Sequence, residues 1–92
     1  MNAKEFVENF ALAAHISNII STALSDADFF NEEDPKSRLI AELKTEFPNL
    51  VTDSDQSFIT QKYEEWRRQS PAQKLYMSRS EYIASAIVAK SL

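Results

Sequence analysis

The sequence predicts an all-α fold, a compact bundle of four to five short helices that forms a single helical domain over residues 1–92. Three observations support this prediction. The chain contains no glycine, and tight hairpin turns depend on glycine. Apolar residues recur at the three- and four-residue spacings of helices. Capping residues, some followed directly by proline, mark repeated helix starts along the chain.

Asn2 and Glu5 form a capping-box pair at the start of the chain. The helix that follows is expected to run from Ala3 to about Leu24. Its polar residues share a narrow sector: Lys4, Glu8, His15, Asn18 and Thr22. Its apolar residues spread over more than half of the circumference: Phe6, Phe10, Ala13, Ile16, Ile19, Ile20, Ala23 and Leu24. A surface helix normally has a narrower apolar stripe.

This first helix is therefore either central in the bundle or packed both on its own bundle and on a second chain. In the second case a homodimer would form through a set of its apolar residues: Phe6, Phe10, Ile16, Ile19 and Ile20. A larger core shared between two copies would help a chain of this length, because a small domain buries a small fraction of its surface.

Residues 25–34 are expected to form a loop or short turn, since they are rich in Ser, Asp and Asn. Asp34 followed by Pro35 predicts the start of a second helix. Its apolar positions are Leu39, Ile40, Leu43 and Phe47. Pro48 stops this helix, and residues 49–52 form a connector.

The last part of the chain predicts a third helix over about residues 54–68, capped by Asp53. Its inward face would be Phe58, Ile59, Tyr63 and Trp66. Ser70 before Pro71 marks another helix start. The final helix is expected over about residues 79–89, with an inward face of Tyr82, Ile83, Ala86 and Ile87.

Ser78 and Glu81 form a further capping box, which predicts a break between Met77 and Ser78. One continuous helix over residues 71–89 is the alternative.

Composition excludes several classes of site. The chain has no cysteine, so disulfides, thiolate metal sites and cysteine nucleophiles are impossible. The absence of glycine excludes Gly-rich nucleotide loops. No signal peptide and no membrane span are expected. With no disulfide framework, a cytoplasmic location is expected.

Charge is distributed unevenly along the chain. Residues 1–34 hold seven acids and one base, whereas residues 35–92 hold seven acids and nine bases. The acids gather with two aromatics in residues 26–34, which we call the acidic segment. Its candidate partner-binding residues are Asp26, Asp28, Phe29, Phe30, Glu32, Glu33 and Asp34. A calcium loop is disfavoured because Phe30 takes the third ligand position and glycine is absent.

Three uses of the acidic segment stay open. It could compete for a basic partner, or its aromatics could anchor in a partner pocket. Alternatively, Phe29 and Phe30 could pack in the protein's own core, while the acids favour the N-terminus of the second helix.

Basic and aromatic residues alternate in a second candidate site, over residues 62–79. We call it the basic–aromatic face, with the candidate residues Lys62, Trp66, Arg67, Arg68, Lys74 and Arg79. Bases neutralise phosphates and aromatics stack on nucleobases, so the pattern fits a protein partner or, as a weaker signal, nucleic acid. Its aromatics could instead be core, with the bases solvated or paired to the acidic segment.

Residues 77–87 have the sequence Met-Ser-Arg-Ser-Glu-Tyr-Ile-Ala-Ser-Ala-Ile. This stretch resembles the second helix of ribbon-helix-helix repressors, where an S-R-S-E start and an apolar face follow a short turn. The resemblance implies phosphate contacts by Ser78, Arg79 and Ser80. The sequence departs from that family elsewhere, because the turn has no glycine, residues 69–77 are long for a connector, and no short basic strand precedes them.

No catalytic, cofactor or metal constellation is expected. His15 is the only histidine, and chemistry at a lone imidazole needs a nucleophile or further ligands. We therefore expect a non-enzymatic protein-binding module: a small acidic adaptor, regulator or inhibitor that occludes a basic surface of a larger partner. The alternatives are a DNA-binding transcriptional regulator, using residues 62–79 and the helix start at 78–80, and a structural subunit of a homo-oligomeric assembly.

Overall fold

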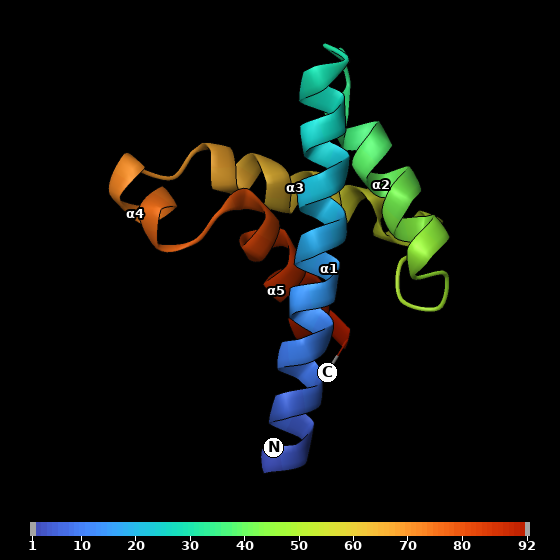
Figure 1. The fold of residues 1–92 in the computed structure, drawn as a ribbon, viewed down its shortest axis with the longest axis vertical. Helices are drawn as coiled ribbons and strands as arrows, with labels where there is room; N and C mark the ends of the chain where they lie inside the picture. Colours follow the sequence, from blue (N-terminus) through green and yellow to red (C-terminus); the bar gives the residue numbers. More distant parts are fainter. Residues whose placement is uncertain (1, 92) are drawn as a thin grey trace.

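The computed structural model describes residues 2–91, apart from the side chain of Phe6. Its elements are α1 (Ala3–Phe29), α2 (Pro35–Glu46), the short 3-10 turn η1 (Asp53–Asp55), α3 (Gln56–Arg67), α4 (Pro71–Tyr76) and α5 (Arg79–Ser91). No strand occurs in the part of the chain that is described. The predicted all-α bundle is confirmed (Figure 1).

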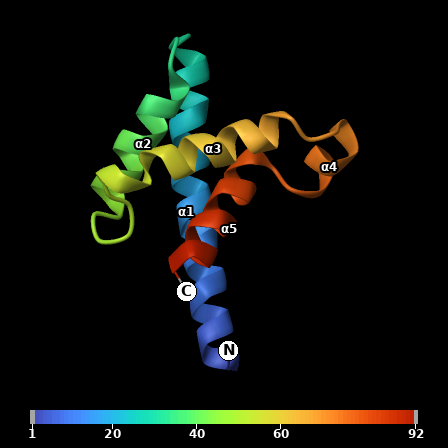
Figure 2. The same cartoon turned by 180° about the vertical axis from the view of Figure 1, so that it is seen from behind.

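Helix α1 is central in the bundle, which was one of the two arrangements predicted for it. It packs on α5 and on α2, while α3 packs on α5, and α4 stands away from the rest (Figures 1 and 2). At 1.5 Å per residue, the 27 residues of α1 span about 40 Å. The longest dimension of the molecule is 42 Å, so α1 runs from one end of the protein to the other.

The predicted loop over residues 25–34 is wrong in its first half, because α1 continues to Phe29. Ala27 is buried, so the extra turn adds apolar contact that offsets the weak helix propensity of its Ser and Asp neighbours. The chain then reverses at Asn31, which has a φ of 54°. Asparagine tolerates this left-handed conformation better than other residues with a Cβ.

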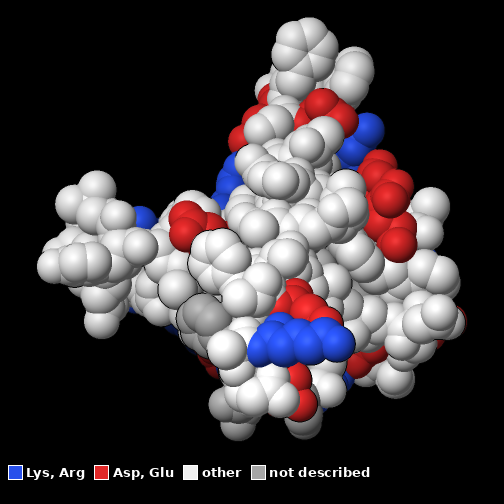
Figure 3. Space-filling view, turned by 60° about the horizontal axis from the view of Figure 1, so that its bottom comes forward, with Lys and Arg blue, Asp and Glu red and all other residues white. Residues whose placement is uncertain are grey.

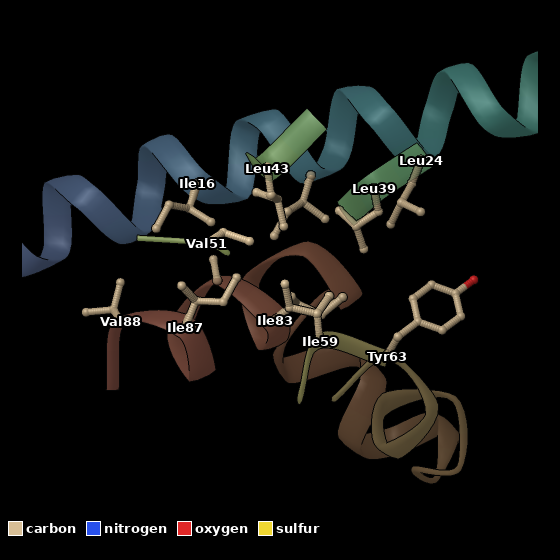
Figure 4. Packing of buried hydrophobic residues seen from close by; sticks show 12 residues of the cluster. Ile16, Leu24, Leu39, Leu43, Val51, Ile59, Tyr63, Ile83, Ile87 and Val88 are labelled. Carbon is tan, nitrogen blue, oxygen red and sulfur yellow. The ribbon is translucent and has the colours of Figure 1, made fainter. Parts of the chain in front are cut away.

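Apolar side chains from α1, α2, α3 and α5, together with Val51 from the connector, form one core (Figure 4). Its members are Ile16, Ile20, Leu24, Leu39, Leu43, Val51, Ile59, Tyr63, Ile83, Ala84, Ile87 and Val88. Ile16 and Ile20 are fully enclosed in it. The predicted dimer face is therefore wrong at these two residues. Ile19 packs partly against the same core, whereas Phe10 is exposed.

The capping signals placed most helix ends correctly. The Asp34 side chain accepts from the backbone N–H of Ser37 at the start of α2. The start of the third helix differs from the prediction. The capping box before it is formed by Thr52 and Asp55, and not by Asp53. Of its predicted inward face, Ile59 and Tyr63 are buried, and Phe58 and Trp66 are half-buried. The predicted break between Met77 and Ser78 is confirmed.

Of the residues that the final helix was predicted to turn inward, Ile83 and Ile87 are buried, and Tyr82 and Ala86 are half-buried. Within the described residues, no helix is both long enough and apolar enough to cross a bilayer.

Candidate functional site

Residues 67–78 leave the bundle as a lobe that we call the α4 protrusion. Both ribbon views show it extending away from the other helices (Figures 1 and 2). Ser70 caps α4 in a reciprocal capping box with Gln73, and Pro71 occupies the first turn. The six-residue helix that results buries none of its own residues. It is thus ordered by its caps and by contacts at its base.

The base of the protrusion is closed by three contacts around Trp66. The indole Nε1 donates to the backbone oxygen of Met77 at 3.0 Å. The Lys74 ammonium lies 4.8 Å from the centre of the indole ring, within the range of a cation–π contact. Lys74 also donates to the backbone oxygen of Arg67 at 2.9 Å. Trp66 therefore organises the protrusion, and it is not a member of the core cluster.

The tip of the protrusion presents Leu75 and Tyr76, whose exposed fractions are 89% and 90%. Figure 3 shows the lobe at the left as mostly uncharged atoms. The predicted site residues included neither of these two side chains. A signal was available, because the capping boxes at Ser70 and Ser78 lie only eight residues apart. A helix that fits between them is too short to bury an apolar face.

The basic–aromatic face is not one continuous cationic surface. Its bases on α3 are paired with acids of the same helix. Lys62 lies 3.2 Å from Glu65, and Arg67 lies 3.4 Å from Glu64. The face does bring Trp66 and Lys74 together, in the base of the protrusion.

Arg79 joins the two predicted sites. Its Nη2 lies 3.1 Å from the Asp28 carboxylate of α1, so a base of the basic–aromatic face is paired with an acid of the acidic segment in the same chain. This pairing was one of the predicted alternatives. Arg68 is exposed on the protrusion.

A small polar network connects α3 to α5 and α2. The Tyr82 hydroxyl donates to Glu65 at 2.9 Å, and this bond, followed by the one from Lys62, lowers the pKa of Glu65. The same carboxylate raises the pKa of Tyr82. A hydrogen bond from Lys36, at 3.0 Å, lowers the pKa of Glu64. These groups cross-link helices, and none of them has the raised carboxyl pKa of a general acid.

The acidic segment is divided between a helix end and a turn. Asp26, Asp28 and Phe29 belong to α1. Asp34 caps α2, and its hydrogen bonds from Ser37 lower its pKa. Within the turn, Glu32 is paired with Arg38 of α2. The segment therefore uses part of its charge inside the protein.

The two aromatics of the acidic segment lie outside the core. Phe29 and Phe30 are 78% and 64% exposed, which excludes the alternative in which they pack in the protein's own core. Their rings meet edge to face, with centroids 5.0 Å apart. The Arg38 guanidinium lies 5.8 Å from the Phe30 ring centre. They form a second exposed apolar feature, at the opposite end of α1 from its N-terminus.

A groove with a volume of about 280 Å³ lies between α1 and α5. We call it the α1/α5 groove. Its lining residues are Phe10, Ala13, Ala14, Ser17, Asn18, Met77, Glu81, Ala84 and Ser85. Most of them are small, so the walls are shallow.

His15 does not join a site. Its ring packs edge to face on Phe47, with centroids 5.2 Å apart. Among the described residues, no group of three His, Asp or Glu side chains is placed to hold a metal ion.

The segment that resembles a ribbon-helix-helix repressor is a capped helix start. Ser78 and Glu81 exchange capping hydrogen bonds, Ser80 is buried, and Arg79 is paired with Asp28. The family's strand has no counterpart in residues 2–91. The chain as a whole matches no protein-family model, no curated protein sequence and no solved structure.

Proposed function

We propose that this chain is a non-enzymatic protein-binding module that contacts its partner through the tip of the α4 protrusion. The observation that supports the proposal is the exposure of Leu75 and Tyr76, about nine-tenths each, on a lobe fixed at its base by Trp66. Within a monomer these side chains have no apolar neighbours to cover them. Exposed apolar groups that gather in one place mark interaction surfaces in proteins.

The chemistry of the tip suits an anchor. Tyrosine buries a large apolar ring yet keeps a hydroxyl for a polar contact, and it is enriched at binding hot spots. The contacts of Trp66 with Met77 and Lys74 hold the lobe before binding. A surface that is already ordered loses less conformational entropy on association.

Charge suggests the character of the partner. Residues 67–78 contain no acid, and Arg68 is exposed on this lobe, so an apolar pocket with an acidic rim would complement the tip. The acidic segment is a weaker candidate, because Asp28, Glu32 and Asp34 already have partners in the chain. For a DNA-binding role, Arg79 would first have to release Asp28.

The proposal is tested by replacing Tyr76 with a photo-crosslinking phenylalanine analogue in the full chain and identifying the crosslinked proteins from host lysate. The matched control places the same analogue at Phe29, which is similarly exposed. We expect one protein to crosslink at position 76 and not at 29, and nuclease treatment to leave it in place.

Substitution then quantifies the contact with the protein so identified. The double variant L75A/Y76A should bind at least tenfold more weakly than the unmodified chain, while the control F29A/F30A binds as before. Equal affinity for both variants, or crosslinking only to nucleic acid, would contradict the proposal.

A further inference from the structure

The C-terminal end of α1 carries two aromatic rings outside the core. Figure 1 shows this end of the helix extending beyond α2 and α3. Phe29 and Phe30 are 78% and 64% exposed, and their rings meet edge to face. Asp26 lies three and four residues before them, so its carboxylate shares their face of the helix. This end of α1 therefore places an exposed aromatic pair beside an acid.

Two carboxylates of the acidic segment, those of Asp26 and Glu33, have no ionic or hydrogen-bonding partner in the described part of the chain. Residues 25–35 contain no base. Asp26 also lies in the last turn of α1, where the negative end of the helix dipole disfavours an acid. A cation bound beside Asp26 would relieve this unfavourable interaction.

The chain itself shows which cation suits this end of α1. Arg38 places its guanidinium 5.8 Å from the centre of the Phe30 ring, and the same guanidinium pairs with Glu32. A guanidinium can stack on an aromatic ring while it binds a carboxylate, whereas an ammonium is a compact and strongly hydrated point charge. Phe29 and Asp26 offer the same combination of ring and carboxylate to an arginine from outside the chain.

We propose that this end of α1 binds a basic, arginine-containing segment of a second protein. One arginine of that segment stacks on the Phe29 ring and pairs with Asp26, and Glu33 attracts a further base. Charge selects this partner, because the carboxylates at the same end repel nucleic acid and anionic membranes. The surface is distinct from the tip of the α4 protrusion, whose lobe contains no acid. The two surfaces therefore suit partners of opposite charge.

The size of the aromatic pair predicts a short segment and a weak contact. One aromatic side chain buries at most about 250 Å², so the two rings provide less than about 500 Å². A standard interface buries about 800 Å² per partner. A short segment can be bound within the smaller area, and we expect its dissociation constant in the micromolar range or above.

The probe is a fluorescently labelled peptide of alternating arginine and alanine, whose anisotropy is measured while the full chain is added at low ionic strength. We expect F29A and D26N each to raise the dissociation constant roughly fivefold. The matched controls are F10A, which truncates an exposed phenylalanine of the same helix, and E8Q, which changes the net charge as D26N does. Both controls should bind the peptide as the unmodified chain does.

A lysine–alanine peptide of the same length should bind roughly fivefold more weakly, because an ammonium cannot stack on the ring and hold the carboxylate in the same way. All the exchanged side chains are exposed, so circular dichroism should show every variant folded. No binding of the arginine peptide, equal losses for D26N and E8Q, or equal affinity for both peptides would overturn the proposal. L75A/Y76A should leave the peptide's affinity unchanged, which separates this result from the proposed function.

Discussion

The indole nitrogen of Trp66 donates to the backbone oxygen of Met77, eleven residues later, at 3.0 Å. This one bond joins the end of α3 to the residue that directly follows α4. It closes the α4 protrusion at its base, so the chain leaves the bundle and returns to it at a fixed point. The exposed Leu75 and Tyr76 lie just before that point.

Replacing Trp66 with phenylalanine should loosen the protrusion and leave the bundle folded. The variant keeps an aromatic ring for Lys74 but loses the donor, which is expected to cost about 1 kcal/mol. Amide hydrogen exchange should become faster in residues 68–78 and stay unchanged in α1. If exchange in the protrusion were unaffected, the bond would have no organising role.

Replacing Ile20 with alanine should cost about 2–5 kcal/mol of unfolding free energy, because the side chain is fully buried and its removal leaves a cavity. F10A, a truncation of an exposed side chain on the same helix, should cost less than about 0.5 kcal/mol. Urea denaturation of both variants at low protein concentration gives the comparison. Similar losses for the two would show that α1 is oriented differently.

The sequence predicted the helix starts well because capping is local chemistry. Asp34 before Pro35, and Ser78 with Glu81, act within a single turn of helix. The continuation of α1 through residues 25–29 was missed because Ser and Asp favour loops locally. What extends the helix is the burial of Ala27 in the folded bundle, which no local pattern reveals.

The candidate sites were harder to predict than the fold. Composition marked the acids and bases but could not show that Arg79 and Asp28 pair across 51 positions. Trp66 was expected on the inward face of its helix, yet its indole N–H is used by a backbone oxygen in the protrusion. Exposure of Tyr76 follows from where α4 stands in space, and local spacing does not determine that.

Acid should destabilise the protein as carboxylates lose their partners, and besides Asp34 there are three whose pKa is lowered. Asp55 is held mainly by Lys90, Glu64 by Lys36 and Glu65 by Tyr82, and each pKa is lowered on folding. The unfolded chain therefore takes up protons first, as pH falls below the ordinary values of 4.5 for Glu and 3.8 for Asp. Stability is lost from there down through the lowered folded values.

Urea titrations between pH 7 and pH 3 check this prediction. The urea concentration at the unfolding midpoint should stay constant in the upper part of this pH range and fall in the lower part. E65Q should reduce the dependence, since it removes one titrating group. A midpoint that rises on acidification would contradict the assignment.

Replacing Asp34 with alanine should cost about 1 kcal/mol, because α2 loses the side chain that accepts from Ser37 at its first turn. Replacing the neighbouring exposed acid Glu33 with alanine changes the net charge equally and provides the control. Thermal unfolding of the two variants separates capping from charge. Equal shifts would assign the effect to charge alone.

The packing of α1 on α5 has a consequence for biosynthesis. The first helix of the chain is covered by the last one, and Ile16 touches a core that Ile83 and Ile87 complete. During synthesis, Ala3–Phe29 is therefore made before α5, and the apolar face of α1 stays without its packing partner in the nascent chain. This separation also raises contact order above that of bundles built from neighbouring helices, so folding is expected to be slower than in those bundles.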